Sequence, residues 1–124
     1  MNEHHSHRSW VRKFADAFRG LALGVRGQSS FFVHFFVAAA VVLAAAVLRV
    51  DHVEWCLLLM CIAGVLTAEM FNSALERLAR AITDELHPDV GAALDIGSAA
   101  VLVASIGAAV VGVIVFAGRL VALL

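Results

Sequence analysis

The chain has 124 residues, of which 62% are hydrophobic and 15% are charged, and its mean hydropathy is +0.93. This composition excludes a soluble globular domain of the same length and indicates an integral membrane protein. The formal net charge of −1 carries little information, because in a membrane protein the placement of charges matters more than their sum. At roughly 20 apolar residues per span, the length allows one domain with about three transmembrane helices.

The first residues of the chain are polar. Residues 1–8 include His4, His5 and His7, and a short histidine-rich tract can bind metal. At the start of a chain such a tract is more often a flexible tail, and this is what we expect here.

Residues 9–27 have the pattern of an amphipathic helix. Apolar side chains recur at three- and four-residue steps, and the basic side chains fall mostly elsewhere around the helix. The apolar stripe consists of Trp10, Phe14, Phe18, Leu21 and Val25. A basic amphipathic helix with aromatic residues on its apolar face is typical of a helix that lies in the membrane interface. We favour this interpretation over an ordinary solvated helix packed on a core.

Three apolar stretches follow, at residues 31–48, 53–71 and 96–116. Each is long enough to cross a membrane as a helix, and the first is interrupted only by His34. The helical pattern of the second continues until Pro88 breaks it, because the residue before a proline disfavours the helical region. We therefore expect residues 72–95 to form a helix extension and a loop, and the whole chain to be one all-α membrane domain.

The basic residues predict the orientation of the chain. They concentrate before the first span and again in residues 77–95, whereas the turn after the first span has only Arg49, set against Asp51 and Glu54. The positive-inside rule therefore places the N-terminus and residues 77–95 in the cytoplasm. Glu69 then lies near the cytoplasmic end of the second span, where a nucleotide could reach it.

Two carboxylates and a carboxamide lie at the end of the second span. On a helix, Glu69, Asn72 and Glu76 occupy positions i, i+3 and i+7 and share one face. An ionisable group in a membrane span is costly and marks a candidate functional site. Glu69, which is deeper and less hydrated, suits a general base that takes a proton from a hydroxyl. Glu76, at the headgroup level, suits Mg²⁺ held together with substrate phosphates, and Asn72 could orient the base or the nucleophile.

Other interpretations of these polar residues remain open. Glu69 could instead pair with a basic side chain or an amide of a neighbouring helix. Asp95 precedes the third span and could be only its N-cap. Cys56 and Cys61 lie five residues apart in an apolar run, and we interpret them as small buried hydrophobic residues rather than a disulfide or metal site.

Three motifs follow one another in the second half of the chain: Glu69-x-x-Asn72-Ser73-Ala74-x-Glu76, Asp84-Glu85-x-His87 and Asp95-x-Gly97-Ser98-Ala99-Ala100. Together they resemble the signature of the small prokaryotic diacylglycerol kinases, a family that includes the undecaprenol kinases. His34 and the residues around His87 are more similar to the undecaprenol kinase branch. The motif that begins at Asp95 is more similar to the diacylglycerol kinase branch.

The resemblance implies an ATP-dependent lipid kinase. Such an enzyme transfers the γ-phosphate of Mg-ATP to a membrane lipid hydroxyl, here of diacylglycerol or undecaprenol, mainly by positioning and charge neutralisation. It also implies a homotrimer in the bacterial inner (cytoplasmic) membrane, with active sites between protomers at the cytoplasmic side. The partners would be the lipid, ATP and further copies of the chain, with Mg²⁺ as cofactor and no nucleic acid. Three thin helices would also leave Glu69 exposed to lipid unless another chain covers it, which argues for oligomerisation.

The resemblance also implies roles for individual residues, namely those at positions that match the family's motifs. Glu69 becomes the catalytic base with Asn72 beside it, and Glu76 becomes a metal ligand. The nucleotide-binding positions are Arg12, Glu76, Glu85, His87, Gly91 and Asp95. The positions next to the lipid substrate are Arg19, Phe31, Glu69 and Ser98.

Three positions depart from the family pattern around the nucleotide. Gln28 stands where a second metal-binding glutamate is usual and is a weaker Mg²⁺ ligand. Leu94 replaces a lysine that meets the ATP phosphates, and Arg80 replaces an acid. Arg80, Arg77 or Arg12 could supply positive charge in compensation, since arginine can bind phosphate in a bidentate manner.

Two other functions therefore stay open besides a lipid kinase. One is a membrane protein of the same fold with altered or lost phosphotransfer, that is, a pseudokinase or a binding module. The other is a small proton-coupled transporter, because glutamates inside membranes also serve proton relays, although there we would expect the acid nearer the middle of the bilayer.

Overall fold

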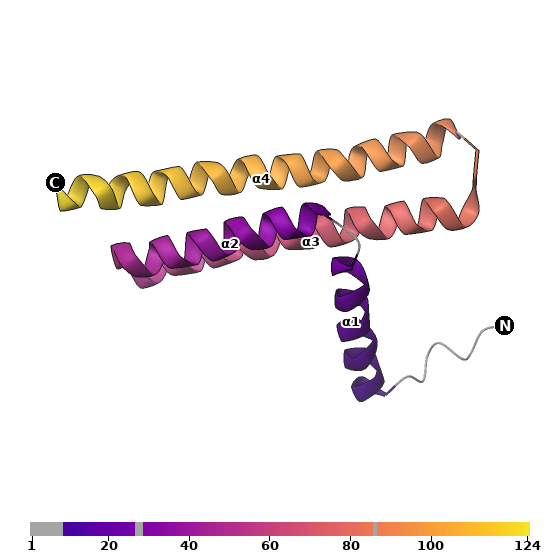
Figure 1. The fold of residues 1–124 in the computed structure, drawn as a ribbon, viewed down its shortest axis with the longest axis horizontal. Coiled ribbons are helices and arrows are strands. Elements are labelled where there is room, and N and C mark those ends of the chain that lie inside the picture. Colours follow the sequence, from indigo (N-terminus) through magenta and orange to yellow (C-terminus); the bar gives the residue numbers. More distant parts are fainter. Residues whose placement is uncertain (1–8, 27–28, 86) are drawn as a thin grey trace.

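The computed structural model describes residues 9–26, 29–85 and 87–124. This part of the chain contains four α-helices: α1 (Trp10–Val25), α2 (Ser29–Leu48), α3 (His52–Ile82) and α4 (Pro88–Leu123). Figure 1 shows α2, α3 and α4 running side by side along the long axis, whereas α1 runs across them near the start of α2. No strand occurs among the described residues. The predicted all-α fold, with one separate N-terminal helix and three long apolar helices, is confirmed.

Helix α1 begins with a capped turn and keeps its apolar stripe exposed. The Ser9 side chain accepts a hydrogen bond from the backbone N–H of Arg12 at 3.2 Å, as expected of an N-cap serine. Trp10, Phe14 and Phe18 are 72%, 62% and 70% exposed, and no residue of α1 is buried. An exposed aromatic stripe on a helix that crosses the others is what a helix lying in a membrane interface requires.

A tight turn joins α2 to α3. Arg49 has a φ of 53°, and the backbone N–H of Val50 bonds back to the carbonyl of Ala45 at 3.2 Å. Asp51 then caps α3: its Oδ1 accepts from the N–H of Glu54 at 2.8 Å, and Glu54 Oε1 accepts from the N–H of Asp51 at 3.0 Å. These two bonds form a capping box, which explains why acids occupy this short polar turn.

Helices α3 and α4 are longer than a membrane is thick. At a rise of about 1.5 Å per residue, the 31 residues of α3 and the 36 residues of α4 measure about 46 Å and about 54 Å, against a hydrocarbon core of about 30 Å. The 20 residues of α2 match that core. Because a short turn keeps α2 and α3 level at one end, α3 extends beyond the start of α2 at the other (Figure 1). Glu76, Arg77 and Arg80 lie in this extension.

The last helix begins earlier than the sequence predicts. Helix α4 starts at Pro88, eight residues before the expected third span, and its N-cap is His87, whose Nδ1 accepts from the N–H of Asp89 at 3.1 Å. Proline is favoured in the first turn of a helix, because it has no N–H to leave unpaired there. Asp95 therefore lies inside α4, and the interpretation of Asp95 as an N-cap is wrong.

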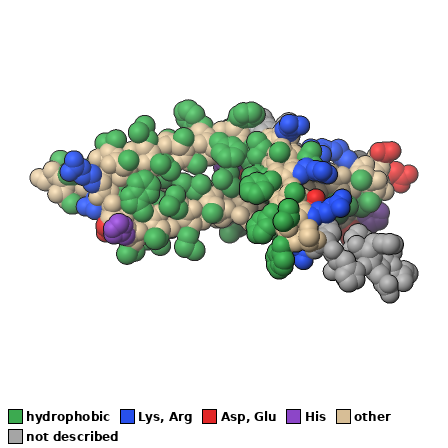
Figure 2. Space-filling model, turned by 90° about the horizontal axis from the view of Figure 1, so that it is seen from below, with side chains coloured by type: hydrophobic (Ala, Val, Ile, Leu, Met, Phe, Trp, Pro, Cys, Tyr) green, Lys and Arg blue, Asp and Glu red, His purple; other side chains and the backbone are tan. Residues whose placement is uncertain are grey.

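The packed core is small, as expected when lipid covers the outside. Ala45, Val50, Leu58 and Val115 form a buried cluster at the end of the bundle near the α2–α3 turn. Beyond that cluster, Glu54 of α3 and Arg119 of α4 form an ion pair at 3.3 Å. In Figure 2 the charged side chains gather toward the two ends of the molecule, and hydrophobic side chains cover the stretch between them. This distribution fits three helices that cross a membrane.

Candidate functional site

Glu69 is buried against the first turn of α2. Glu69 is only 4% exposed, and both oxygens of its carboxylate contact side chains of α2. His34 Nε2 lies 2.9 Å from Glu69 Oε1, and Ser30 Oγ donates to Glu69 Oε2 at 3.2 Å. Ser30 and His34 are one helical turn apart, so both point from α2 toward the same carboxylate. Because α2 starts at this level, the carboxylate lies where the apolar spans give way to the charged extension of α3.

The surroundings of Glu69 change two expectations from the sequence. We expected Glu69 to be exposed to lipid unless a second chain covered it, but α2 of the same chain covers it. The burial of this carboxylate is therefore no argument for oligomerisation. The alternative that Glu69 pairs with a basic side chain of a neighbouring helix describes the observed contact with His34. Such a contact is compatible with catalysis, because catalytic bases are commonly oriented by a further side chain.

Asn72 and Glu76 form the second half of the site. The Asn72 amide donates from Nδ2 to Glu76 Oε1 at 3.2 Å, which confirms that these two residues share a face of α3. Asn72 Oδ1 is buried and has no hydrogen-bond partner within the described part of the chain. The hydrogen bond of the amide thus goes to the proposed metal ligand, whereas Ser30 and His34 hold the proposed base.

Glycine at position 97 lets α4 approach this half of the site closely. A Cβ atom on Gly97 would lie 2.5 Å from Asn72 Oδ1 and 3.0 Å from Leu75 Cδ1, and Gly97 is buried. Real Cβ atoms do not come so close to other heavy atoms. Gly97 therefore sets the distance between α3 and α4 beside Asn72.

The structure does not gather the remaining nucleotide-binding candidates around Glu76 but spreads them over α1, the α3–α4 connection and α4. Arg12 on α1, Glu85 in the α3–α4 connection, and Gly91 and Asp95 on α4 are all exposed. His87 lines a hollow of about 370 Å³ together with Ile82, Thr83, Asp89, Val90 and Ala93. Gln28 lies outside the described residues.

Of the other lipid-site candidates, two are exposed and one is buried. Arg19 is exposed on α1 and Ser98 is exposed on α4, next to Gly97. Phe31 is only 1% exposed and follows Ser30 in the first turn of α2. Within one chain, Phe31 therefore helps to bury the site and offers no free surface to a lipid.

The three basic residues that could compensate for Leu94 differ in their surroundings. Arg77 Nη2 donates to the carbonyl of Leu23 at 3.2 Å and so ties α3 to the last turn of α1. Arg80 and Arg12 are exposed. Leu94 itself is half-buried on α4.

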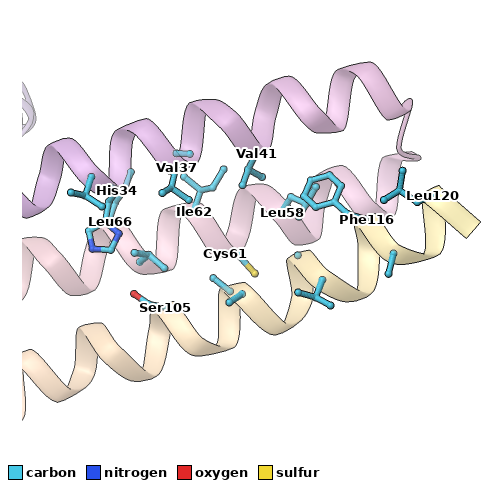
Figure 3. Close-up of a pocket in the computed structure, with 18 residues that line it drawn as sticks. His34, Val37, Val41, Leu58, Cys61, Ile62, Leu66, Ser105, Phe116 and Leu120 are labelled. Carbon is cyan, nitrogen blue, oxygen red and sulfur yellow. The ribbon is translucent and has the colours of Figure 1, made fainter.

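A long apolar groove begins beside Glu69. It has a volume of about 670 Å³ and runs between α2, α3 and α4. Figure 3 shows His34 and Ser105 at one end of the groove, with Phe116 and Leu120 at the other. His34 thus borders the groove and also contacts Glu69. His34 therefore links the groove to the buried carboxylate, although Glu69 is not among the residues that line the groove.

The donor atoms present suit a metal ion that brings other ligands with it. Among the described residues no group of three or more His, Cys, Asp or Glu side chains is close enough to hold an ion. The Glu76 carboxylate and the unpaired Asn72 Oδ1 are nevertheless the hard oxygen donors that Mg²⁺ prefers. Mg²⁺ is commonly bound by one or two carboxylates plus substrate phosphates, and these residues fit that arrangement.

Two residues at the edge of this site were not predicted as site residues from the sequence. His34 was recognisable as the one ionisable side chain of the first apolar stretch, residues 31–48, which is a signal for function in membranes. Ser30 gave no signal, because it lies just before the expected start of that span. Their contacts with Glu69 depend on how α2 and α3 pack, which local spacing does not report.

The fold and this site define a small polytopic membrane protein with a hydrogen-bonded carboxylate buried at the membrane edge. Residues 15–116 match the family model described as prokaryotic diacylglycerol kinase, and the chain belongs to this family. It is 29% identical over 111 residues to the undecaprenol kinase of Bacillus subtilis (strain 168), with 90% of each protein covered. It is 30% identical over 100 residues to a diacylglycerol kinase of Synechocystis sp., covering 80% of this chain and 57% of that protein. The family and the names of these relatives support a membrane lipid kinase.

Proposed function

We propose that the chain transfers the γ-phosphate of Mg-ATP to a membrane lipid hydroxyl, with Glu69 as general base. The observation that carries this proposal is the position of the Glu69 carboxylate. It is buried at the level where α2 starts, so a lipid hydroxyl can reach it from the membrane and a nucleotide from the charged extension of α3. Glu69 takes the hydroxyl proton as the hydroxyl oxygen bonds to the γ-phosphorus, and ADP leaves.

The nucleotide would bind along the extension of α3 and the start of α4. Glu76, held by Asn72, together with Asn72 Oδ1 would hold Mg²⁺. When bound, this ion neutralises charge on the phosphates. Because Arg77 is bound to the end of α1, Arg80 and Arg12 are the better candidates to replace the missing lysine at Leu94.

The acceptor is a lipid alcohol, for which we propose undecaprenol or diacylglycerol. The relatives named above are an undecaprenol kinase, which the chain matches over nearly its whole length, and a diacylglycerol kinase. The apolar groove between α2, α3 and α4 gives the acceptor's hydrocarbon chain an apolar surface that ends at His34, beside the base. Apolar side chains discriminate weakly between hydrocarbon chains, at about 1–3 kcal/mol per methylene-sized feature, so the choice of lipid has to be measured.

The family resemblance also supports proposals about the setting of the enzyme. We propose a homotrimer in the bacterial inner membrane with the N-terminus, the α3 extension and the site on the cytoplasmic side. The distribution of basic residues supports this orientation. The wide apolar surface of α2, α3 and α4 leaves room for contacts between copies as well as with lipid.

A protein with altered or lost phosphotransfer is the second candidate function. The neutral Gln28 and the apolar Leu94 favour it, because both replace groups that would help to bind Mg-ATP, and the reversed charge at Arg80 is a third departure from the family pattern. In that case the buried carboxylate and the groove would bind a lipid alcohol without transferring phosphate to it.

One assay separates these functions. The purified protein in lipid vesicles is given ATP labelled at the γ-phosphate, and incorporation into undecaprenol and into diacylglycerol is compared. Glu69→Gln, which keeps the size of the side chain, is expected to lower transfer by about 100-fold or more, since general bases contribute about 10² to 10⁴. An unimpaired Glu69→Gln would contradict the role of Glu69. Transfer to neither lipid, without binding of Mg-ATP, would favour the second candidate function.

A further inference from the structure

We propose that His34 is a positioning residue that holds Glu69 ready to accept a proton. The inference rests on the proposed function of Glu69 as general base and adds a side chain from a different helix to the site. His34 Nε2 lies 2.9 Å from Glu69 Oε1, the distance of a charge-assisted hydrogen bond. His34 is the only ionisable residue of α2, and it lies where this helix meets the carboxylate.

The two carboxylate oxygens have different tasks in this arrangement. Oε1 contacts His34 Nε2 at 2.9 Å, whereas Oε2 accepts from the Ser30 hydroxyl at the longer distance of 3.2 Å. A hydroxyl of a lipid can replace the Ser30 hydroxyl on Oε2, because the two groups offer the same donor. The contact of His34 with Oε1 then stays in place and fixes the direction of the free lone pair on Oε2.

The contact also compensates for the burial of the Glu69 carboxylate. An ionised carboxylate buried away from water is costly unless hydrogen bonds compensate it. His34 Nε2 at 2.9 Å and the Ser30 hydroxyl at 3.2 Å give each of the two Glu69 oxygens such a partner. Without His34, Oε1 loses the partner that holds it, and the carboxylate is free to turn away from the approaching lipid hydroxyl.

The location of His34 connects this role to the substrate. His34 lies at one end of the apolar groove (Figure 3), so a lipid alcohol in the groove can bring its hydroxyl next to the imidazole that contacts Glu69. Other groups at this end of the groove are uncharged: Ser105 on α4 and Leu66 on α3. His34 thus lines this end of the groove and also contacts the Glu69 carboxylate.

Kinetics of His34 variants test the proposal. His34→Ala is expected to lower kcat by about 10- to 100-fold, with the KM values for Mg-ATP and the lipid within about twofold, since a base misplaced by about 1 Å can cost about 100-fold. His34→Gln, which keeps an N–H donor, is expected to regain part of the loss. In a Glu69→Gln background His34→Ala should cause no further loss, because positioning has no effect without the base. Phe36→Leu, an exposed residue on the opposite side of α2, serves as the control and should leave kcat unchanged.

A second measurement does not depend on activity. Dicyclohexylcarbodiimide, an apolar reagent, modifies protonated carboxyl groups inside membranes, and mass spectrometry of the purified protein in vesicles quantifies the modification at Glu69. Removing His34 uncovers one side of the Glu69 carboxyl group and is therefore expected to raise its labelling several-fold, while His34→Gln and Phe36→Leu should stay near wild type. Unchanged labelling in His34→Ala, or additive losses of kcat in the double variant, would overturn the proposal. An inactive wild type whose labelling still depends on His34 would overturn only the kinase function, whereas an active enzyme insensitive to His34 would overturn only this inference.

Discussion

Asn72 of α3 packs against Gly97 of α4, and the lack of a side chain on Gly97 sets the distance between these two helices. A Cβ on Gly97 would lie 2.5 Å from Asn72 Oδ1, closer than atoms pack. Because Asn72 also holds Glu76 at 3.2 Å, the spacing of α3 and α4 and the geometry of the proposed metal ligand depend on one another. This coupling gives a direct test of the second half of the site.

Gly97→Ala is expected to lower both stability and the affinity for nucleotide. The added methyl must displace the Asn72 amide, and overpacking of this kind costs about 1–3 kcal/mol. Once displaced, Asn72 no longer orients Glu76, so KM for Mg-ATP should rise while KM for the lipid changes little. Thermal unfolding in detergent and steady-state kinetics measure both effects.

Gly107→Ala is the matched control for this change. Gly107 lies on the same helix, and a Cβ there would meet nothing within 4 Å. Its replacement should leave KM unchanged and not lower the unfolding temperature. Equal behaviour of the two variants would show that Gly97 does not position Asn72.

The sequence predicts one half of the candidate site better than the other. Asn72 and Glu76 are four residues apart on one helix, so the helical period alone places them together, and the hydrogen bond between them confirms it. His34 and Glu69 are 35 residues apart, and their contact depends on the length of α2 and the geometry of the turn after it. The left-handed Arg49 and the capping box at Asp51 fix that geometry, and neither produces a periodic signal.

The boundary between α3 and α4 shows a second limit of the sequence pattern. Pro88 was used as a helix breaker, which is right for the residues before it, since α3 ends at Ile82. The same proline also suits the first turn of a helix, and α4 begins there. Apolar content could not reveal this start, because Asp89 and Asp95 interrupt the first two turns of α4 and separate them from the uninterrupted apolar stretch.

The hydrogen bond from Arg77 to Leu23 should hold α1 in place against α3. In Arg77→Ala this bond, from Nη2 to the carbonyl at 3.2 Å, is lost, and the last turn of α1 is expected to open more often. Hydrogen exchange of the α1 amides measures this and should become several-fold faster. Arg80→Ala removes a nearby exposed charge and is the control, so equally fast exchange in both variants would contradict the role of Arg77.

If Arg80 replaces the missing lysine at position 94, we expect its guanidinium group to bind the phosphates of the nucleotide. It is exposed on the α3 extension, one turn beyond Glu76. A charge-assisted hydrogen bond is worth about 1.5–3 kcal/mol, so Arg80→Ala should raise KM for Mg-ATP by about tenfold or more. Arg80→Lys, which keeps the charge, should recover part of the loss. An unimpaired Arg80→Ala would remove this compensation and strengthen the case for a protein with reduced phosphotransfer.

The capping box at Asp51 should make stability depend on pH at the acidic end. The backbone N–H of Glu54, which donates to Asp51 at 2.8 Å, is the main cause that lowers the pKa of this exposed carboxyl below its ordinary value of 3.8. A group whose pKa is lowered by folding stabilises the fold at pH values above its unfolded pKa, and this contribution is lost as the pH falls through the folded pKa. Asparagine caps a helix about as well but does not titrate in this range. The difference in unfolding temperature between wild type and Asp51→Asn should therefore be constant above the ordinary pKa and shift against wild type below it. A difference that stays constant down to the acid limit would show that the cap bond does not depend on the charge of Asp51.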